Sequence, residues 1–171
     1  MLRIEKSGSV WTVIHSRFDA ASNAVDPESA EALATALLAF DADTSASVAV
    51  LWGEGGPFCA GWDLKFASTL SDRDAFQREV VDGLAFPTGA NAAPRGPLGP
   101  TRLELSKPVV AAVEGPAVAG GMERALWCDS TCWRATPTSA SIAGAGAFRC
   151  SMAAACACRG WWGRAARWRS Y

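Results

Sequence analysis

The chain contains 171 residues, of which 50% are hydrophobic and 19% are charged, and its formal net charge is −1. This balance excludes an intrinsically disordered chain and a strongly basic nucleic-acid-binding protein. No stretch approaches the roughly 18 uninterrupted apolar residues of a membrane span, and the first residues lack the apolar core of a secretory signal. We therefore expect a modest cytoplasmic domain with no membrane and no nucleic-acid partner.

The hydrophobic pattern predicts strands and helices that alternate along residues 1–129. Asp26 and Pro27 have the residue types of a helix N-cap and first helical position. In chain order we expect a hairpin over 2–16, a helix from 27 that ends within 41–45, a strand at 47–52, a helix over 71–84, a loop over 86–100, a strand at 108–113 and a helix over 119–128. This order implies an α/β layered architecture.

The composition changes abruptly after Asp129. All 17 acidic residues lie within 1–129, whereas 130–171 contain six Arg and no Lys, Asp or Glu. The same segment contains no Leu and no Val, the residues that normally supply core volume, but it holds four of the six Cys and four of the eight Trp. We therefore treat 1–129 as the core domain and 130–171 as a separate, aberrant and poorly ordered segment.

Three interpretations of 130–171 are open. A basic tail could bind nucleic acid, and Cys132, Cys150, Cys156 and Cys158 could form disulfides or bind a metal. The cysteine spacing and the single histidine, His15, argue against a metal site. The favoured interpretation is out-of-frame translation of G+C-rich DNA, because codons for 130–154 can be chosen so that a one-base shift encodes an ordinary strand, loop and helix start.

Two loop-to-helix junctions, 58–65 and 107–123, carry the candidate chemistry. Each follows an apolar strand, and each has small residues that let the backbone approach a ligand while the next helix presents unpaired N–H groups. Two such donors that converge on one oxygen would form an oxyanion hole. Either junction alone is typical of an ordinary strand-to-helix turn, but both together favour the functional interpretation.

These junctions resemble those of the crotonase, or enoyl-CoA hydratase/isomerase, superfamily. The run Phe58-Cys59-Ala60-Gly61-Trp62-Asp63-Leu64-Lys65 is similar to one family signature, and the run from Lys107 through the glycine-rich turn to Glu123 is similar to another. The resemblance covers essentially all of 1–129 and implies a crotonase-like (ClpP/crotonase) ββα spiral core that is incomplete after residue 129. It also implies an acyl-CoA substrate, which brings its own CoA, with no other cofactor and no metal.

The resemblance assigns roles to particular residues. The backbone N–H groups of Trp62 and Gly120 would form the oxyanion hole around the thioester carbonyl, and Glu123 would act as the acid–base residue. The CoA moiety would be bound by four residues: Ala60, Gly61, Lys65 and Gly121. Family members are trimers or hexamers, an assembly that this chain is expected to form poorly.

The chain also departs from the family pattern. Trp62 is large where a small residue is usual, Pro116 lacks an N–H, and Arg124 replaces an aliphatic residue, so that it is either buried or turned to solvent. The family's second catalytic glutamate would lie beyond Asp129, where no acid exists. We therefore expect weak or no activity, with a non-catalytic acyl-CoA-binding remnant, an isomerase or a thioester hydrolase as alternatives.

Two remaining side chains, His15 and Cys59, are of types that often act in catalysis, but we expect structural roles for both. His15 has no identifiable Ser or Cys partner and is expected to be a polar strand residue. Cys59 lies within the first junction, close to Trp62, and is expected to pack as a small buried hydrophobe.

Overall fold

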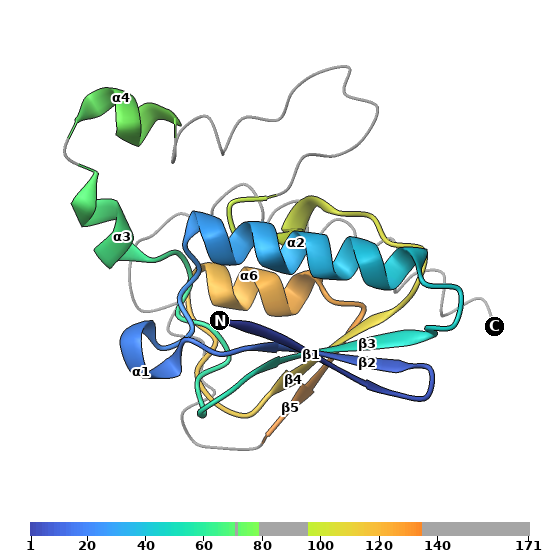
Figure 1. The fold of residues 1–171 in the computed structure, drawn as a ribbon. Helices are drawn as coiled ribbons and strands as arrows, with labels where there is room; N and C mark the ends of the chain where they lie inside the picture. Colours follow the sequence, from blue (N-terminus) through green and yellow to red (C-terminus); the bar gives the residue numbers. More distant parts are fainter. Residues whose placement is uncertain (71, 79–95, 135–171) are drawn as a thin grey trace, which may run out of the picture.

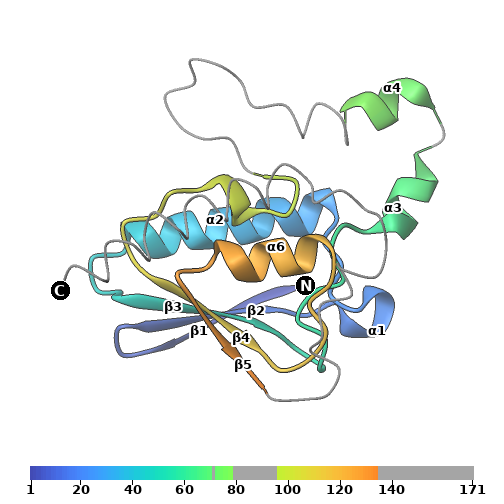
Figure 2. The same cartoon turned by 180° about the vertical axis from the view of Figure 1, so that it is seen from behind.

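The computed structural model describes residues 1–70, 72–78 and 96–134, which form a two-layer α/β fold (Figure 1). The strands are β1 (Leu2–Ser7), β2 (Val10–His15), β3 (Val48–Gly53), β4 (Val109–Val113) and β5 (Ser130–Trp133). The helices are α1 (Phe18–Ala21), α2 (Pro27–Ala42), α3 (Leu64–Thr69), α4 (Arg73–Phe76) and α6 (Gly120–Trp127), with a 3-10 turn, η2 (Pro100–Arg102). Helices α2 and α6 lie side by side on one face of the sheet in both views (Figures 1 and 2).

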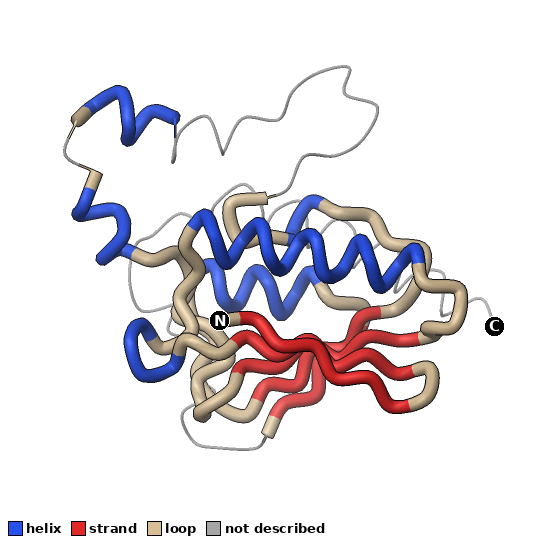
Figure 3. Tube along the Cα trace, in the orientation of Figure 1, coloured by secondary structure: helices blue, strands red, loops and turns tan. Residues whose placement is uncertain are grey.

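The strands of this sheet follow one another in the order β1-β2-β3-β4-β5. Strands β1 and β2 form an antiparallel hairpin in which Gly8 takes a positive φ of 58° in the turn. Strands β2, β3, β4 and β5 are parallel neighbours, so each connection crosses over the sheet. The tube view shows the resulting separation into a helical layer and a strand layer (Figure 3).

The hydrophobic core fills the space between the sheet and the two covering helices. Residues at alternate positions of β3 and β4 are buried, as the period of two in a strand requires. Helix α2 begins at the expected N-cap, where the Asp26 side chain accepts a hydrogen bond from the Ser29 N–H at 2.8 Å. On the core side it buries Leu33, Leu37 and Phe40, which are fully enclosed.

Most of the expected elements are confirmed. The hairpin, α2, β3, β4 and α6 occur within one or two residues of their predicted bounds. Of the helix expected over 71–84, the structure shows α4, which Asp72 caps; residues 71 and 79–84 lie outside the described residues. Of the loop expected over 86–100, residues 96–99 form a tight turn with reciprocal backbone bonds between Gly96 and Gly99, and 86–95 lie outside the described residues.

The sheet continues beyond the composition change after Asp129. Strand β5 adds four residues that pair in parallel with β4. Ser130, Thr131, Cys132 and Trp133 can form this edge because strand pairing uses backbone groups and does not require Leu or Val. The remainder of the expected separate segment, 135–171, lies outside the described residues.

None of the helices in the described part of the chain is long and apolar enough to cross a membrane.

Candidate active site at the ends of β3 and β4

The two loop-to-helix junctions lie next to each other beyond the carboxyl ends of β3 and β4. The N–H groups of Phe58 and Cys59 donate to the Pro116 carbonyl at 2.9 and 3.3 Å, and the Val118 N–H donates to the Cys59 carbonyl at 3.1 Å. Pro116 lacks an N–H, but its carbonyl is the acceptor that joins the loops. The sequence-predicted motifs are therefore brought together by direct backbone pairing.

Gly61 and Gly121 allow this close approach. Gly61 has a φ of 92°, and a Cβ placed on it would lie 3.1 Å from the Gly120 nitrogen and 3.3 Å from the Ala119 Cβ. A Cβ on Gly121 would overlap the Cys59 carbonyl oxygen. A side chain at either position would separate the two loops, so these glycines set the distance between the predicted donors.

The predicted oxyanion donors lie on either side of this glycine contact. The Gly61 carbonyl accepts from the Val25 N–H at 2.8 Å, and the Asp63 N–H donates to the Val25 carbonyl at 2.9 Å. These two bonds hold the backbone on both sides of Trp62. Over the described ranges, neither the Trp62 N–H nor the Gly120 N–H donates to another protein group. That both amides donate to a ligand oxygen stays a prediction.

Glu123 belongs to the first turn of α6, three residues after Gly120. Residues at this spacing lie on the same side of a helix. Its side chain is buried, with 6% exposure. The candidate acid–base carboxylate therefore shares a helix turn with one of the two candidate oxyanion donors.

The Trp62 ring is half-buried and packs against the edge of the core. It meets the Phe66 ring edge-on, with the centroids 6.0 Å apart. An aromatic pair thus flanks the first donor. That Trp62 reshapes an acyl pocket stays a prediction.

The residues expected to bind CoA lie around the same junction but in different environments. Ala60 is half-buried, Gly61 and Gly121 are buried, and Lys65 is exposed. The Lys65 ammonium donates to the Ala20 carbonyl of α1 at 2.9 Å. Contact between these residues and CoA stays a prediction.

Arg124 is buried, which decides between the two expectations for this residue. Its guanidinium donates to the Phe58 carbonyl at 3.0 Å, contacts the His15 Nδ1 at 3.3 Å and lies over the Phe58 ring at 4.9 Å. Because a guanidinium has only donors, Nδ1 accepts and the imidazole proton resides on Nε2. Burial, followed by the charge of Arg124, lowers the pKa of His15 to about 3. His15 is thus a neutral, buried strand residue.

Cys59 is fully buried, as expected for a small apolar side chain. Its sulfur accepts a hydrogen bond from the Gly61 N–H at 3.3 Å.

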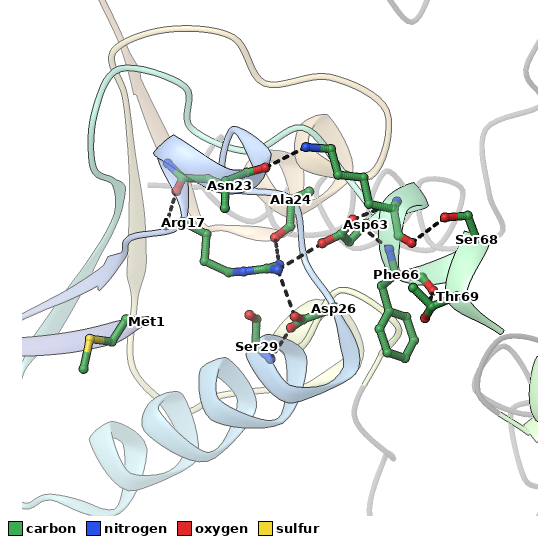
Figure 4. Close-up of polar contacts among 12 residues, drawn as sticks. Met1, Arg17, Asn23, Ala24, Asp26, Ser29, Asp63, Phe66, Ser68 and Thr69 are labelled. Atoms are coloured by element: carbon green, nitrogen blue, oxygen red, sulfur yellow. Dashed lines mark hydrogen bonds and ion pairs between the residues drawn. The ribbon is translucent and has the colours of Figure 1, made fainter.

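A second polar cluster, centred on Arg17, is not suggested by any local pattern (Figure 4). The guanidinium lies between two carboxylates: one of its terminal nitrogens is 3.0 Å from Asp26 and also 3.0 Å from Asp63. Its other terminal nitrogen donates to the Ala24 carbonyl at 2.7 Å. Burial alone would raise the pKa of Asp26, but the hydrogen bonds from Ser29 and the charge of Arg17 hold it below the ordinary value. Asp63 also caps α3 by accepting from the N–H groups of Lys65 and Phe66.

Asn23 holds the start of the first junction. It has a left-handed φ of 57°, its amide donates to the carbonyls of Glu54 and Pro57 at 2.8 and 2.6 Å, and its side-chain oxygen accepts from the Arg17 N–H at 2.7 Å. The polar side chain is fully buried because each of these contacts satisfies one of its groups.

Two cavities lie away from Trp62 and Gly120. One, of about 120 Å³, borders Arg17, His15 and the first turn of α2, and the other, of about 290 Å³, borders Glu114 and Cys132. Neither is lined by Trp62 or Gly120. Among the residues that the structure describes, no three His, Cys, Asp or Glu side chains form a group that could hold a metal ion.

Comparison with known proteins points to one family. Residues 6–86 match the model of the enoyl-CoA hydratase/isomerase family. The chain is 38% identical over 120 residues to enoyl-CoA hydratase EchA19 of Mycobacterium tuberculosis, and the aligned region covers 70% of this chain and 41% of the relative. It is 37% identical over 130 residues to the carnitinyl-CoA dehydratase of Salmonella arizonae, and the aligned region covers 75% of this chain and 43% of the relative.

A solved structure of enoyl-CoA hydratase from Mycobacterium tuberculosis H37Rv superposes with a TM-score of 0.59 at 37% identity, over 77% of this chain and 45% of that one. With its two paired junctions and this fold, the chain belongs to the crotonase, or enoyl-CoA hydratase/isomerase, superfamily, with which it shares the N-terminal portion. The chain spans less than half the length of the curated relatives that it matches.

Proposed function

We propose that this chain binds an acyl-CoA thioester and stabilises the enolate form of its acyl group. The observation that carries the proposal is the pair of unengaged N–H groups, Trp62 and Gly120, on loops held together at Gly61. The thioester oxygen would accept from both amides as negative charge develops on it. Donors fixed before the reaction stabilise such charge by roughly 3 kcal/mol each, because they need no reorganisation.

Glu123 is the acid–base residue of the proposal. In hydration of a 2-enoyl thioester, water attacks the β carbon while Glu123 accepts one of its protons, and the electron pair of the double bond moves onto the thioester oxygen. The enolate then collapses when the α carbon takes up a proton from solvent, and Glu123 releases to solvent the proton that it accepted. The buried position of Glu123 in the same helix turn as Gly120 supports this role.

We also propose that the chain turns over slowly. Residues 130–171 contain no Asp or Glu, so they supply no second carboxylate for the protonation step. Acyl-CoA binding and enolate stabilisation need only the Trp62 and Gly120 amides, so we expect the chain to keep both. In the same proposal, the chain forms a trimer or hexamer of the family type only poorly.

Acetoacetyl-CoA tests the binding step directly, because the enolate of a β-keto thioester absorbs in the near ultraviolet. The chain is expected to raise the enolate fraction of this probe at a fixed pH. Glu123→Gln leaves the two amides in place and should preserve the enolate band. An enolate fraction equal to that in buffer would refute the proposed oxyanion hole.

Hydration of crotonyl-CoA tests the catalytic step. We expect a low rate that falls further in Glu123→Gln, by roughly 100-fold or more for loss of an acid–base group. Glu114→Gln is the matched control, since Glu114 is exposed and follows β4 directly. Equal rates in the wild type and in Glu123→Gln would contradict the acid–base role of Glu123, and a fast wild-type rate would contradict slow turnover.

A non-catalytic acyl-CoA-binding protein is the second candidate. The absence of acids in 130–171 favours it. Thermal stabilisation by crotonyl-CoA, together with equal background hydration by the wild type and Glu123→Gln, would identify this function.

A further inference from the structure

The Arg17 cluster adjoins the proposed oxyanion hole through the backbone of 61–63. Asp63 follows Trp62 directly, and its carboxylate is almost fully enclosed, with 6% side-chain exposure. Arg17 is half-buried, so its ion pair with Asp63 is partly shielded from solvent. Arg17 therefore fixes the side chain of the residue next to the proposed donor.

Arg17 also fixes the segment that holds Trp62 from the other side. It binds the Ala24 carbonyl and the Asp26 carboxylate, which flank Val25. Val25 in turn donates its N–H to the Gly61 carbonyl and accepts from the Asp63 N–H. One guanidinium thus sits between the two short segments 24–26 and 61–63 (Figure 4).

The charges make this cation necessary to the arrangement. Asp26 and Asp63 both contact the same nitrogen of Arg17 at 3.0 Å. Without the cation, these two carboxylates would repel each other across a partly buried space. As the two carboxylates moved apart, segments 24–26 and 61–63 would separate at Val25, and the peptide that carries the Trp62 N–H would tilt.

We propose that Arg17 is a positioning residue that sets the direction of the Trp62 N–H in the oxyanion hole. The proposal rests on the function proposed above, but its geometric part can be tested in the free protein. Lysine is not an equivalent replacement, because a single ammonium cannot reproduce the planar fork that reaches two carboxylates and a carbonyl.

The test removes the side chain and then returns the guanidinium as a solute. Arg17→Ala should enlarge the 120 Å³ cavity that Arg17 lines, which gives free guanidinium a route into the site. Arg3→Ala is the matched control, because Arg3 also pairs with two carboxylates, Glu5 and Glu54, but at the exposed hairpin. Guanidinium is used at millimolar concentration, far below the molar range in which it unfolds proteins.

The first readout is the backbone amide signal of Trp62 in protein labelled with ¹⁵N-tryptophan, assigned by its loss in Trp62→Phe. We expect this signal to move in Arg17→Ala, to return toward its wild-type position with guanidinium, and to stay in place in Arg3→Ala. The second readout is the enolate fraction of bound acetoacetyl-CoA, which should fall by roughly tenfold in Arg17→Ala and recover with guanidinium, because small misplacements of a catalytic group are costly.

The outcomes separate the two proposals. No enolate enrichment by the wild type refutes the oxyanion hole, while the amide signal still decides whether Arg17 orients Trp62. An unmoved signal in Arg17→Ala, or an equal movement in Arg3→Ala, overturns the positioning role. If Arg17→Ala does not fold, Arg17→Lys replaces it; a wild-type signal in Arg17→Lys overturns the proposal, and a displaced one supports it.

Discussion

Arg124 and His15 form a buried polar pair in the core beneath the first junction. Arg124 is fully enclosed and donates to the Phe58 carbonyl, while His15 supplies a neutral acceptor. A buried guanidinium is costly unless its surroundings offer acceptors and an aromatic face. The stability of this part of the core therefore depends on His15 remaining unprotonated.

This dependence predicts a loss of stability in mild acid. The pKa of His15 is lowered in the folded chain from 6.5 to about 3, so between these values the unfolded chain binds a proton that the folded chain does not. The free energy of unfolding should thus fall by about 2 kcal/mol between pH 7 and pH 5. His15 is the sole histidine of the chain, and urea unfolding at the two pH values measures the effect.

His15→Gln is the control for this prediction, since its amide oxygen can still accept from Arg124 but does not titrate in this range. The variant should lose much less stability over the same interval. An equal loss in the wild type and in His15→Gln would contradict the role assigned to His15.

Gly61 should be intolerant of even one methyl group. Gly61→Ala places a side chain at a φ of 92° and 3.1 Å from the Gly120 nitrogen, so it should both destabilise the fold and abolish enolate enrichment of acetoacetyl-CoA. Gly56→Ala is the control: its φ is 105°, but a Cβ there meets nothing within 4 Å. That variant should lose about 1–2 kcal/mol through backbone strain alone and keep the enolate band. Retention of the enolate band by Gly61→Ala would show that the two junctions need not be in close contact.

At the scale of elements, two N-cap aspartates differ in what they support. Asp26 caps a helix of 16 residues with six buried side chains and also pairs with Arg17. Asp72 caps the four-residue α4, which buries none. We expect Asp26→Ala to cost about 1–2 kcal/mol in urea unfolding and Asp72→Ala about 0.5 kcal/mol or less. Equal costs would mean that the Arg17 pair and the helix packing add nothing to the cap.

Local signals explain why the hairpin, α2, β3, β4 and α6 could be predicted. A Gly turn, an Asp-Pro start and uninterrupted apolar runs each specify an element within a few residues of sequence. The two junctions were predictable for the same reason. The Arg17–Asp63 pair joins residues 46 apart, and the Arg124–His15 contact joins residues 109 apart. No pattern within one segment encodes such pairs, because they exist only after the strands have assembled.

Strand β5 was unexpected for a different physical reason. The composition of 130–171 indicates a poor core, but β5 uses only its first four residues as a backbone edge beside β4. Core composition and strand pairing are separate requirements, and a short edge strand has to meet only the second.

At the scale of the whole molecule, the composition change after Asp129 leads to a genetic prediction. No Asp, Glu, Leu or Val occurs after that residue. The folded domain nevertheless has no boundary there, because β5 continues the sheet. We expect sequencing of the coding DNA across codons 125–135 to find one inserted or deleted base relative to the frame translated here. Confirmation of the translated frame would make 130–171 a genuine part of the protein and would favour the acyl-CoA-binding function over the enzyme.

The strand order has a consequence for how the sheet is made. Because each of the five described strands lies beside the one synthesised before it, none of these five has to insert between two that are already paired. The nascent chain can therefore extend the sheet from one edge as it leaves the ribosome, starting with the local hairpin. Beside β1, which stays at one edge, the strand most recently released forms the other open edge, so a pause in translation after β3 or β4 would expose a growing edge that is ready to pair with another chain.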